Sequence, residues 1–240
     1  MNRIARDAGD REAMAADHAV RYNAIKDMHH CLMTRQTQAQ QLNTLVDSAL
    51  LAPTDETRKK LRQLAEASEP GPLAERIRRR ATLLARRRNA DRTPLLRLRD
   101  ELILAVYAAE VPKGWSCGWA DGASFEANGR QQAGIGGLLV DSDGLVIERI
   151  SRSIGEKGAF AAELAALAVV MQCATERQQK WLWLYTDNRG LVQLWDEHRG
   201  DNRLNELRRQ AASLKRFILR AIPRLHNQPA NALARAAVPR

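Results

Sequence analysis

From residue 115 onward, short apolar runs alternate with longer stretches of helical spacing. This alternation is typical of an α/β domain, in which helices cover a sheet. Runs rich in β-branched, aromatic and glycine residues predict five strands, at 115–123, 134–141, 145–154, 181–186 and 218–223. The stretches between them predict helices at 159–177, 188–199, 203–217 and 227–238. The expected fold is therefore a mixed five-stranded sheet flanked by helices.

The first 112 residues have a different texture, with few glycines and few strand signals. Apolar residues at helical spacing predict four helices, at about 28–50, 54–68, 73–88 and 94–110, with a chain break at Glu69-Pro-Gly-Pro72. Val111-Pro-Lys-Gly114 is the expected linker. We therefore predict an all-α helical domain over 1–112 and an α/β domain over 113–240 that folds on its own.

The composition favours a polyanionic partner. The chain has 240 residues and a net charge of +10, which points to nucleic acid before a membrane. Its three cysteines show no paired spacing, which fits reduced thiols in a cytoplasmic protein and predicts no zinc site. The polar N-terminus shows no signal peptide, and no uninterrupted apolar stretch approaches the roughly 18–20 residues of a membrane span.

Most of the excess positive charge lies between residues 75 and 99, where ten arginines face only two acidic residues. One interpretation is an arm that follows phosphates and adds affinity without sequence preference. The expected contacts are Arg78, Arg79, Arg80, Arg86, Arg87 and Arg88. No aromatic residue interleaves them, so base stacking is not expected there. The alternatives are a solvated helix face and a docking surface for an acidic protein partner.

Three acidic residues interrupt or end apolar segments: Asp121, Glu163 and Asp187. An ionised carboxylate is costly to bury unless something pairs with it. Taken singly, each has a structural explanation, such as a helix cap for Asp187 or a helix-edge position for Glu163. Taken together, they favour a divalent cation, and oxygen ligands select Mg²⁺ or Mn²⁺. The joint pattern therefore predicts metal-assisted phosphoryl chemistry.

Four sequence blocks resemble those of ribonuclease H type 1, in its plant and archaeal-like branch. The first is Asp121-Gly-Ala-Ser with Asn128-Gly and Gly134-Ile-Gly-Gly137. The second is Ala162-Glu-Leu-Ala-Ala-Leu167, and the third is Tyr185-Thr-Asp-Asn188. The last runs from Arg224 through Asn227 and Asn231 to Ala234. The resemblance covers about residues 114–238, with the order and spacing of the blocks intact.

This resemblance implies a ribonuclease H-like fold and a metal-dependent endonuclease that hydrolyses the RNA strand of RNA–DNA hybrids. It implies two Mg²⁺ ions, for which Mn²⁺ can substitute, in a two-metal-ion mechanism. The implied catalytic and metal-binding residues are Asp121, Glu163, Asp187 and Asn231. The implied nucleic-acid contacts are Asn128, Asn188, Arg189, Arg224 and Asn227. The helical domain would then add nucleic-acid affinity.

The sequence also departs from the family pattern. Asn231 stands where the family has a fourth carboxylate, and Ala159 and Phe160 replace its paired asparagines. The position of the family's mobile histidine is Ala221, so His226 is expected to be a surface-loop histidine. These departures keep an alternative open: a catalytically weakened adaptor that binds nucleic acid, or a component of a nucleoprotein complex.

Overall fold

The computed structural model describes residues 36–87, 91–127, 130–141 and 145–239. Two of the expected nucleic-acid contacts, Arg88 and Asn128, lie outside the described residues. The chain divides into two compact units, Met1–Leu45 and Val46–Arg240. The helices between residues 54 and 110 therefore belong to the same unit as the sheet, and the predicted division at residue 112 falls inside that unit. Whether 113–240 folds alone stays a prediction.

The N-terminal helical segment is all-α where it is described. Residues 36–51 are helical. They are followed by α2 (Asp55–Glu66), α3 (Pro70–Arg87) and α4 (Thr93–Glu110). The predicted break between the second and third helices is present, but it lies at 67–69 rather than 69–72, because α2 ends at Glu66 and α3 begins at Pro70. The first helical turn needs no intrahelical N–H donors, so prolines are tolerated there.

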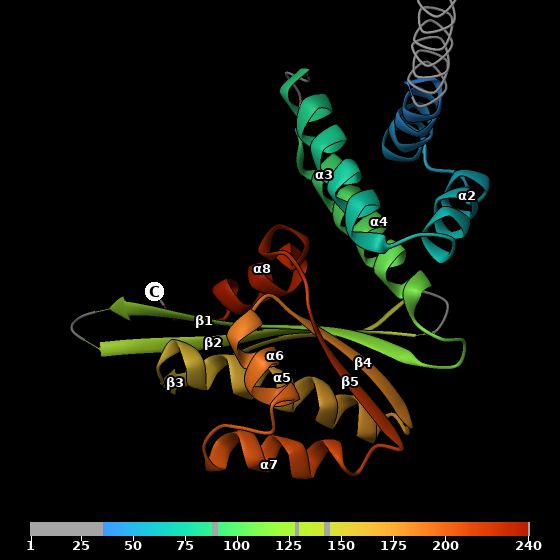
Figure 1. Cartoon of the computed structure of the whole chain (residues 1–240). Helices are drawn as coiled ribbons and strands as arrows, with labels where there is room; N and C mark the ends of the chain where they lie inside the picture. Colours follow the sequence, from blue (N-terminus) through green and yellow to red (C-terminus); the bar gives the residue numbers. More distant parts are fainter. Residues whose placement is uncertain (1–35, 88–90, 128–129, 142–144, 240) are drawn as a thin grey trace, which may run out of the picture. The chain divides into compact units, whose positions relative to one another are not determined.

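The sheet has the predicted five strands (Figure 1). They are β1 (Ser116–Ala127), β2 (Arg130–Val140), β3 (Val146–Glu156), β4 (Trp181–Thr186) and β5 (Arg216–Ala221), in the order β3-β2-β1-β4-β5. β1, β2 and β3 pair antiparallel, whereas β1 pairs parallel with β4, and β4 with β5. The expected mixed sheet, and with it the ribonuclease H-like fold class, is confirmed.

Helices cover both faces of this sheet. The chain after β3 forms α5 (Ala159–Glu176), α6 (Arg189–Asp196), α7 (Asn202–Ala211), the 3-10 turn η1 (Arg224–His226) and α8 (Gln228–Ala236). α5 packs on one face, where Gly122 leaves space for it, and α8 packs on the other, against Gly136. α7 packs against α5 (Figure 1). The predicted helix at 203–217 ends earlier, because the chain turns at Leu214 and enters β5.

Among the described residues, helix α5 is long and apolar enough to cross a membrane by length and composition alone. In the structure it packs on the sheet through apolar residues that include Leu167, Val170 and Met171. This packing explains its apolar composition, because a helix pressed between a sheet and a second helix is buried over much of its circumference.

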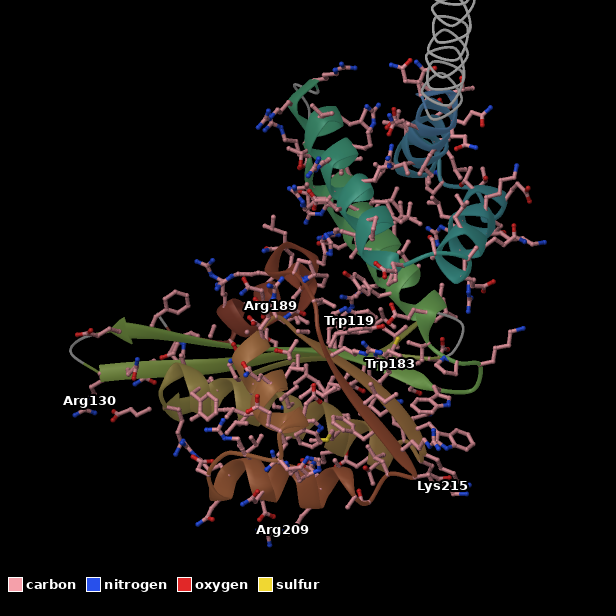
Figure 2. The ribbon with its side chains drawn as sticks, viewed as in Figure 1. Trp119, Arg130, Trp183, Arg189, Arg209 and Lys215 are labelled. Atoms are coloured by element: carbon pink, nitrogen blue, oxygen red, sulfur yellow. The ribbon has the colours of Figure 1, made fainter. Side chains whose placement is uncertain are left out.

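Aromatic side chains connect α4 to the centre of the sheet. The ring of Tyr107, on α4, lies 5.2 Å from that of Tyr185 on β4, and Tyr185 lies 5.2 Å from Trp119 on β1. All three side chains are at most 3% exposed. Figure 2 marks Trp119 and Trp183 in this part of the sheet. Helix α4 thus shares buried contacts with β4, whose Tyr185 packs in turn against Trp119 on β1.

Candidate active site

Strand pairing brings two of the three acidic residues to one place. β1 and β4 are parallel, and their register pairs Trp119 with Tyr185. Asp121 and Asp187 each follow that pair by two residues, so strand periodicity puts them at one level and on one face. Asp121 lies within β1 and is 2% exposed, whereas Asp187 comes directly after the end of β4.

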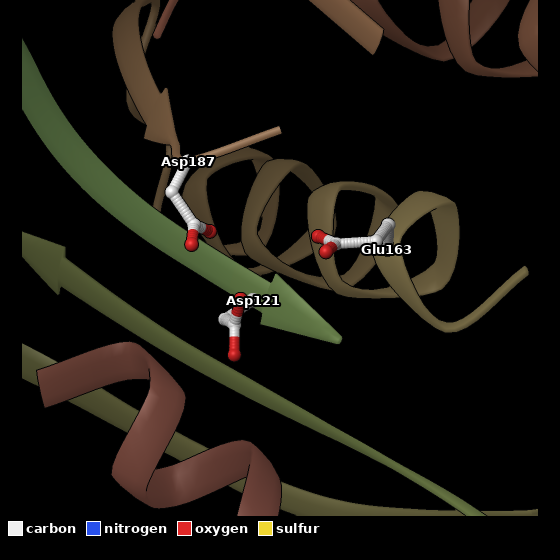
Figure 3. Close-up of side chains that lie close together, drawn as sticks. All are labelled: Asp121, Glu163 and Asp187. Carbon is white, nitrogen blue, oxygen red and sulfur yellow. The ribbon is translucent and has the colours of Figure 1, made fainter. Parts of the chain in front are cut away.

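Glu163 joins them from the second turn of α5 (Figure 3). One oxygen from each of Asp121, Glu163 and Asp187 lies within 4.8 Å of the other two. Gly122 makes this close approach possible. A Cβ added there would come within 2.3 Å of the Glu163 backbone nitrogen and 2.4 Å of the Ala162 carbonyl carbon. The absence of a side chain at position 122 therefore allows α5 to approach β1.

Burial and neighbouring carboxylates disfavour the ionised forms of Asp121 and Glu163. Burial raises the pKa of Asp121 to about 7, and the charge of Asp187 adds to the rise. Burial likewise raises the pKa of Glu163 to about 8, with further contributions from Asp121 and Asp187. The nearest cation that the structure places here is weakly engaged, because Arg224 Nε lies 3.9 Å from Asp187 Oδ2. The cluster therefore carries negative charge that the described side chains compensate only in part.

This donor set fits a divalent metal ion. The carboxylate oxygens are hard ligands, and a cation among them would relieve the repulsion that raises the two pKa values. Asp121, Glu163 and Asp187 would hold such an ion, with Asn231 beside them. An acidic residue cluster is thus present, as the sequence predicts.

Two asparagines from the end of the chain hold the carboxylates in place. Asn231 Nδ2 donates to Asp121 Oδ2 at 2.8 Å. Asn227 Nδ2 donates to Asp187 Oδ1 at 3.1 Å and to the Ala120 carbonyl at 3.0 Å. Asn227 is fully buried, so the expected contact between this side chain and nucleic acid does not fit the structure. Its position makes it a support for Asp187.

The other expected contacts near the site lie in different environments. Asn188 accepts a hydrogen bond from the Leu191 backbone N–H and caps α6, so its side chain has a structural role. This leaves the Asp187 carboxylate to the acidic cluster rather than to a helix cap. Arg189 (Figure 2) and Arg224 are exposed and remain available for a ligand.

The arginines of α3 that were expected to contact nucleic acid divide into two groups. Arg78 and Arg79 donate to Glu75, and Arg80 pairs with Asp47. Arg86 and Arg87 are exposed at the end of the helix. The first three therefore have acidic partners that the sequence interpretation did not foresee.

Sequence reasoning also missed a buried histidine. His226 is 2% exposed, which makes the expectation of a surface-loop histidine wrong. Its ring nitrogens face Tyr107 Oη and Glu75 Oε2, from residues 119 and 151 positions away. No local spacing connects residues so far apart. The one available signal was that His226 directly precedes Asn227, inside the last resembling block.

The mixed sheet has carboxylates on β1, directly after β4 and on the covering helix α5. This arrangement defines a ribonuclease H-like domain. Residues 120–237 match the family described as reverse transcriptase-like. No curated protein gives a significant match to the chain.

Several solved structures are similar to the same region. RNase H1 from Halobacterium salinarum is 22% identical, covers 51% of this chain and 96% of its own, and has a TM-score of 0.47. LC11-RNase H1, isolated from compost and solved with an RNA/DNA hybrid, is 19% identical, with 51% and 96% covered and a TM-score of 0.46. The N-terminal RNase H domain of a Mycobacterium tuberculosis protein is 18% identical, with 51% and 99% covered and a TM-score of 0.45.

Proposed function

We propose that this protein is a metal-dependent endonuclease that hydrolyses the RNA strand of RNA–DNA hybrids. The observation that carries the proposal is the convergence of Asp121, Glu163 and Asp187, from two strands and a helix, within 4.8 Å. The family match over residues 120–237 and the four sequence blocks support the same reaction. Buried carboxylates without an adequate counter-charge weaken a fold, so their presence favours a role in ligand binding.

Two Mg²⁺ ions, or Mn²⁺ in their place, would supply an activated water and stabilise the leaving 3′ oxygen. The residues of the chain prepare the site for them. Asn227 and Asn231 each donate one hydrogen bond to a carboxylate, which fixes Asp187 and Asp121 without adding charge. The exposed guanidinium of Arg224 lies beside Asp187, a position suited to contact with a substrate phosphate.

The helical segment adds affinity for nucleic acid in this proposal. Its exposed arginines, Arg86 and Arg87 among them, attract phosphates irrespective of base sequence. The same proposal assigns the protein to the cytoplasm, in keeping with its cysteine usage.

The test is a cleavage assay on labelled RNA–DNA hybrid, duplex RNA and duplex DNA, with Mg²⁺ and with Mn²⁺. We expect cleavage of the RNA strand of the hybrid alone, and loss of that cleavage in Glu163→Gln. Cleavage that persists in Glu163→Gln would point to a contaminating nuclease or a different site. Equal cleavage of all three duplexes would refute the substrate class.

One observation favours a second candidate, a hybrid-binding adaptor with weakened catalysis. Asn231 presents its amide nitrogen to Asp121, and it contributes no negative charge where the family has a carboxylate. The adaptor would bind hybrid tightly yet leave it intact in both metals. The same assay, combined with a binding titration, separates the two candidates.

A further inference from the structure

A buried network joins the helical segment to the chain beside the active site. His226 lies in η1, with Nδ1 2.8 Å from Tyr107 Oη on α4 and Nε2 3.3 Å from Glu75 Oε2 on α3. Glu75 is held in turn by Arg78 and Arg79. One histidine therefore contacts two helices that precede the sheet in the sequence.

The protonation states of the three side chains fix the direction of these hydrogen bonds. The hydrogen bond from Arg78 is the largest influence on Glu75 and holds its pKa at about 2, so the carboxylate is an acceptor. Burial lowers the pKa of His226 and raises that of Tyr107, which keeps both neutral. The Nε2–H of His226 then donates to Glu75, and the Tyr107 hydroxyl donates to Nδ1. Every member has a partner suited to its charge.

Two members of the network, His226 and Tyr107, connect to the surroundings of Asp187. The residue after His226 is the buried Asn227, which donates to Asp187 Oδ1 and to the carbonyl of Ala120, the neighbour of Asp121. The backbone carbonyl of Tyr107 accepts from Tyr185 Oη at 3.2 Å, and Tyr185 precedes Asp187 by two residues in β4. α4 thus contacts the supports of Asp187 from two directions.

We propose that Tyr107, His226 and Glu75 are positioning residues, which hold Asn227 and through it Asp187 in the geometry that binds a divalent metal. This makes α3 and α4 part of the metal site's supporting structure, beyond any role in nucleic-acid affinity. The inference rests on the proposed metal-dependent function, and it extends that function to residues outside the reverse transcriptase-like region.

The central variant is Tyr107→Phe in the full chain, which removes only the hydroxyl that bonds His226. The matched control is Ser116→Ala, which removes another buried hydroxyl, one that bonds Gln179 at the first residue of β1. The first readout is Mn²⁺ binding by calorimetry without nucleic acid. Hybrid affinity in a metal-free buffer is the second, and the Mg²⁺ concentration for half-maximal cleavage is the third.

We expect Tyr107→Phe to weaken Mn²⁺ binding about tenfold, the effect typical of losing a group that orients a metal ligand. Hybrid affinity should stay unchanged, and Ser116→Ala should bind Mn²⁺ like the wild type. Glu75→Gln, on a partly exposed side chain, keeps an acceptor for His226 and should shift Mn²⁺ binding less than Tyr107→Phe does. Glu75→Gln also tests the positioning role if Tyr107→Phe fails to fold.

Wild-type Mn²⁺ affinity in both Tyr107→Phe and Glu75→Gln would overturn the inference. An equal loss in Ser116→Ala would also overturn it, since the effect would then be general destabilisation. A wild-type protein that binds Mn²⁺ but cleaves no hybrid would refute the proposed function. In that case the loss of Mn²⁺ binding in Tyr107→Phe would still support the positioning role.

Discussion

Helices α3 and α5 each have 18 residues, but they differ in how their charged side chains are compensated. α3 carries six arginines and one glutamate, and its partly buried arginines Arg78 and Arg80 pair with carboxylates. α5 is almost wholly apolar, and its Glu163 faces two further carboxylates. A high density of charge therefore does not identify a ligand site. Carboxylates buried without a counter-charge do, because a bound cation relieves their repulsion and protonation alone leaves no function for their convergence.

The largest effect we predict is from Asp121→Asn. The substitution keeps the shape of the side chain but removes the charge at the centre of the cluster, so cleavage should fall below detection. The metal-free protein should be as stable as the wild type or more so, because repulsion with Asp187 is removed. Cleavage assays and thermal unfolding in EDTA measure both. Cleavage at the wild-type rate would show that the carboxylate cluster next to α5 is not the catalytic site.

Removing the helices should have the next largest effect. A fragment of residues 113–240 retains the sheet, but Tyr185 loses the cover of Tyr107. We expect the fragment to fold, with a free energy of unfolding lower than that of residues 46–240 by roughly 2–4 kcal/mol. This is the cost of exposing one or two large apolar side chains. It should also bind Mn²⁺ more weakly than residues 46–240. Denaturant unfolding of both fragments measures this.

Equal stability of the two fragments would make the helices an independent domain, as the sequence predicts. An insoluble fragment would instead mean that the two parts share an indispensable core.

Acidity should modulate the stability of the metal-free protein. The folded-state pKa values of Asp121 and Glu163 are raised to about 7 and about 8. Their contribution to stability is therefore full below their unfolded-state pKa values, near 4, and is lost as the pH rises toward 8. We expect the Tm in EDTA to fall over that interval. Saturating Mg²⁺ should flatten the decline, as should Asp121→Asn. A Tm independent of pH in EDTA would contradict the burial of these carboxylates.

Asn231→Asp should strengthen metal binding by the carboxylate cluster. A fourth carboxylate next to Asp121 adds an anionic ligand, so the Mg²⁺ concentration for half-maximal cleavage should fall several-fold. The metal-free protein should lose stability because repulsion increases. Unchanged metal dependence would place Asn231 outside the metal site. Asn231→Ala, which cannot ligate at all, is the matched comparison.

The smallest effect concerns α3. Arg86→Gln with Arg87→Gln should weaken hybrid binding and flatten the slope of log K against log salt by roughly 0.9 for each duplex phosphate that the protein no longer neutralises. Cleavage at saturating hybrid should be unchanged. The control is Arg209→Gln, on the outer side of α7, whose side chain is 73% exposed (Figure 2). An unchanged slope in the double variant would favour a protein-docking surface or a merely solvated face.

The sequence predicted the features that depend on local spacing. Alternation and apolar runs located the strands, and the shared position of Asp121 and Asp187 follows from parallel pairing. Contacts between distant segments were beyond such reasoning. His226 looked like a loop residue because its partners lie on α3 and α4. Asn227 looked like a surface contact because its neighbours Ala120 and Asp187 meet it only in the folded chain.

Gly122 gives the site an unusual vulnerability to mutation. The contact between α5 and β1 is made by backbone atoms at this position, and every other amino acid adds a Cβ there. A side chain can be trimmed or enlarged by small steps, but a backbone contact of this kind offers no intermediate size. Any first substitution at position 122 must displace Glu163 from its two partners. Substitutions at position 122 therefore cannot change the spacing of the carboxylates by small amounts. A single mutation there either keeps that spacing or abolishes it.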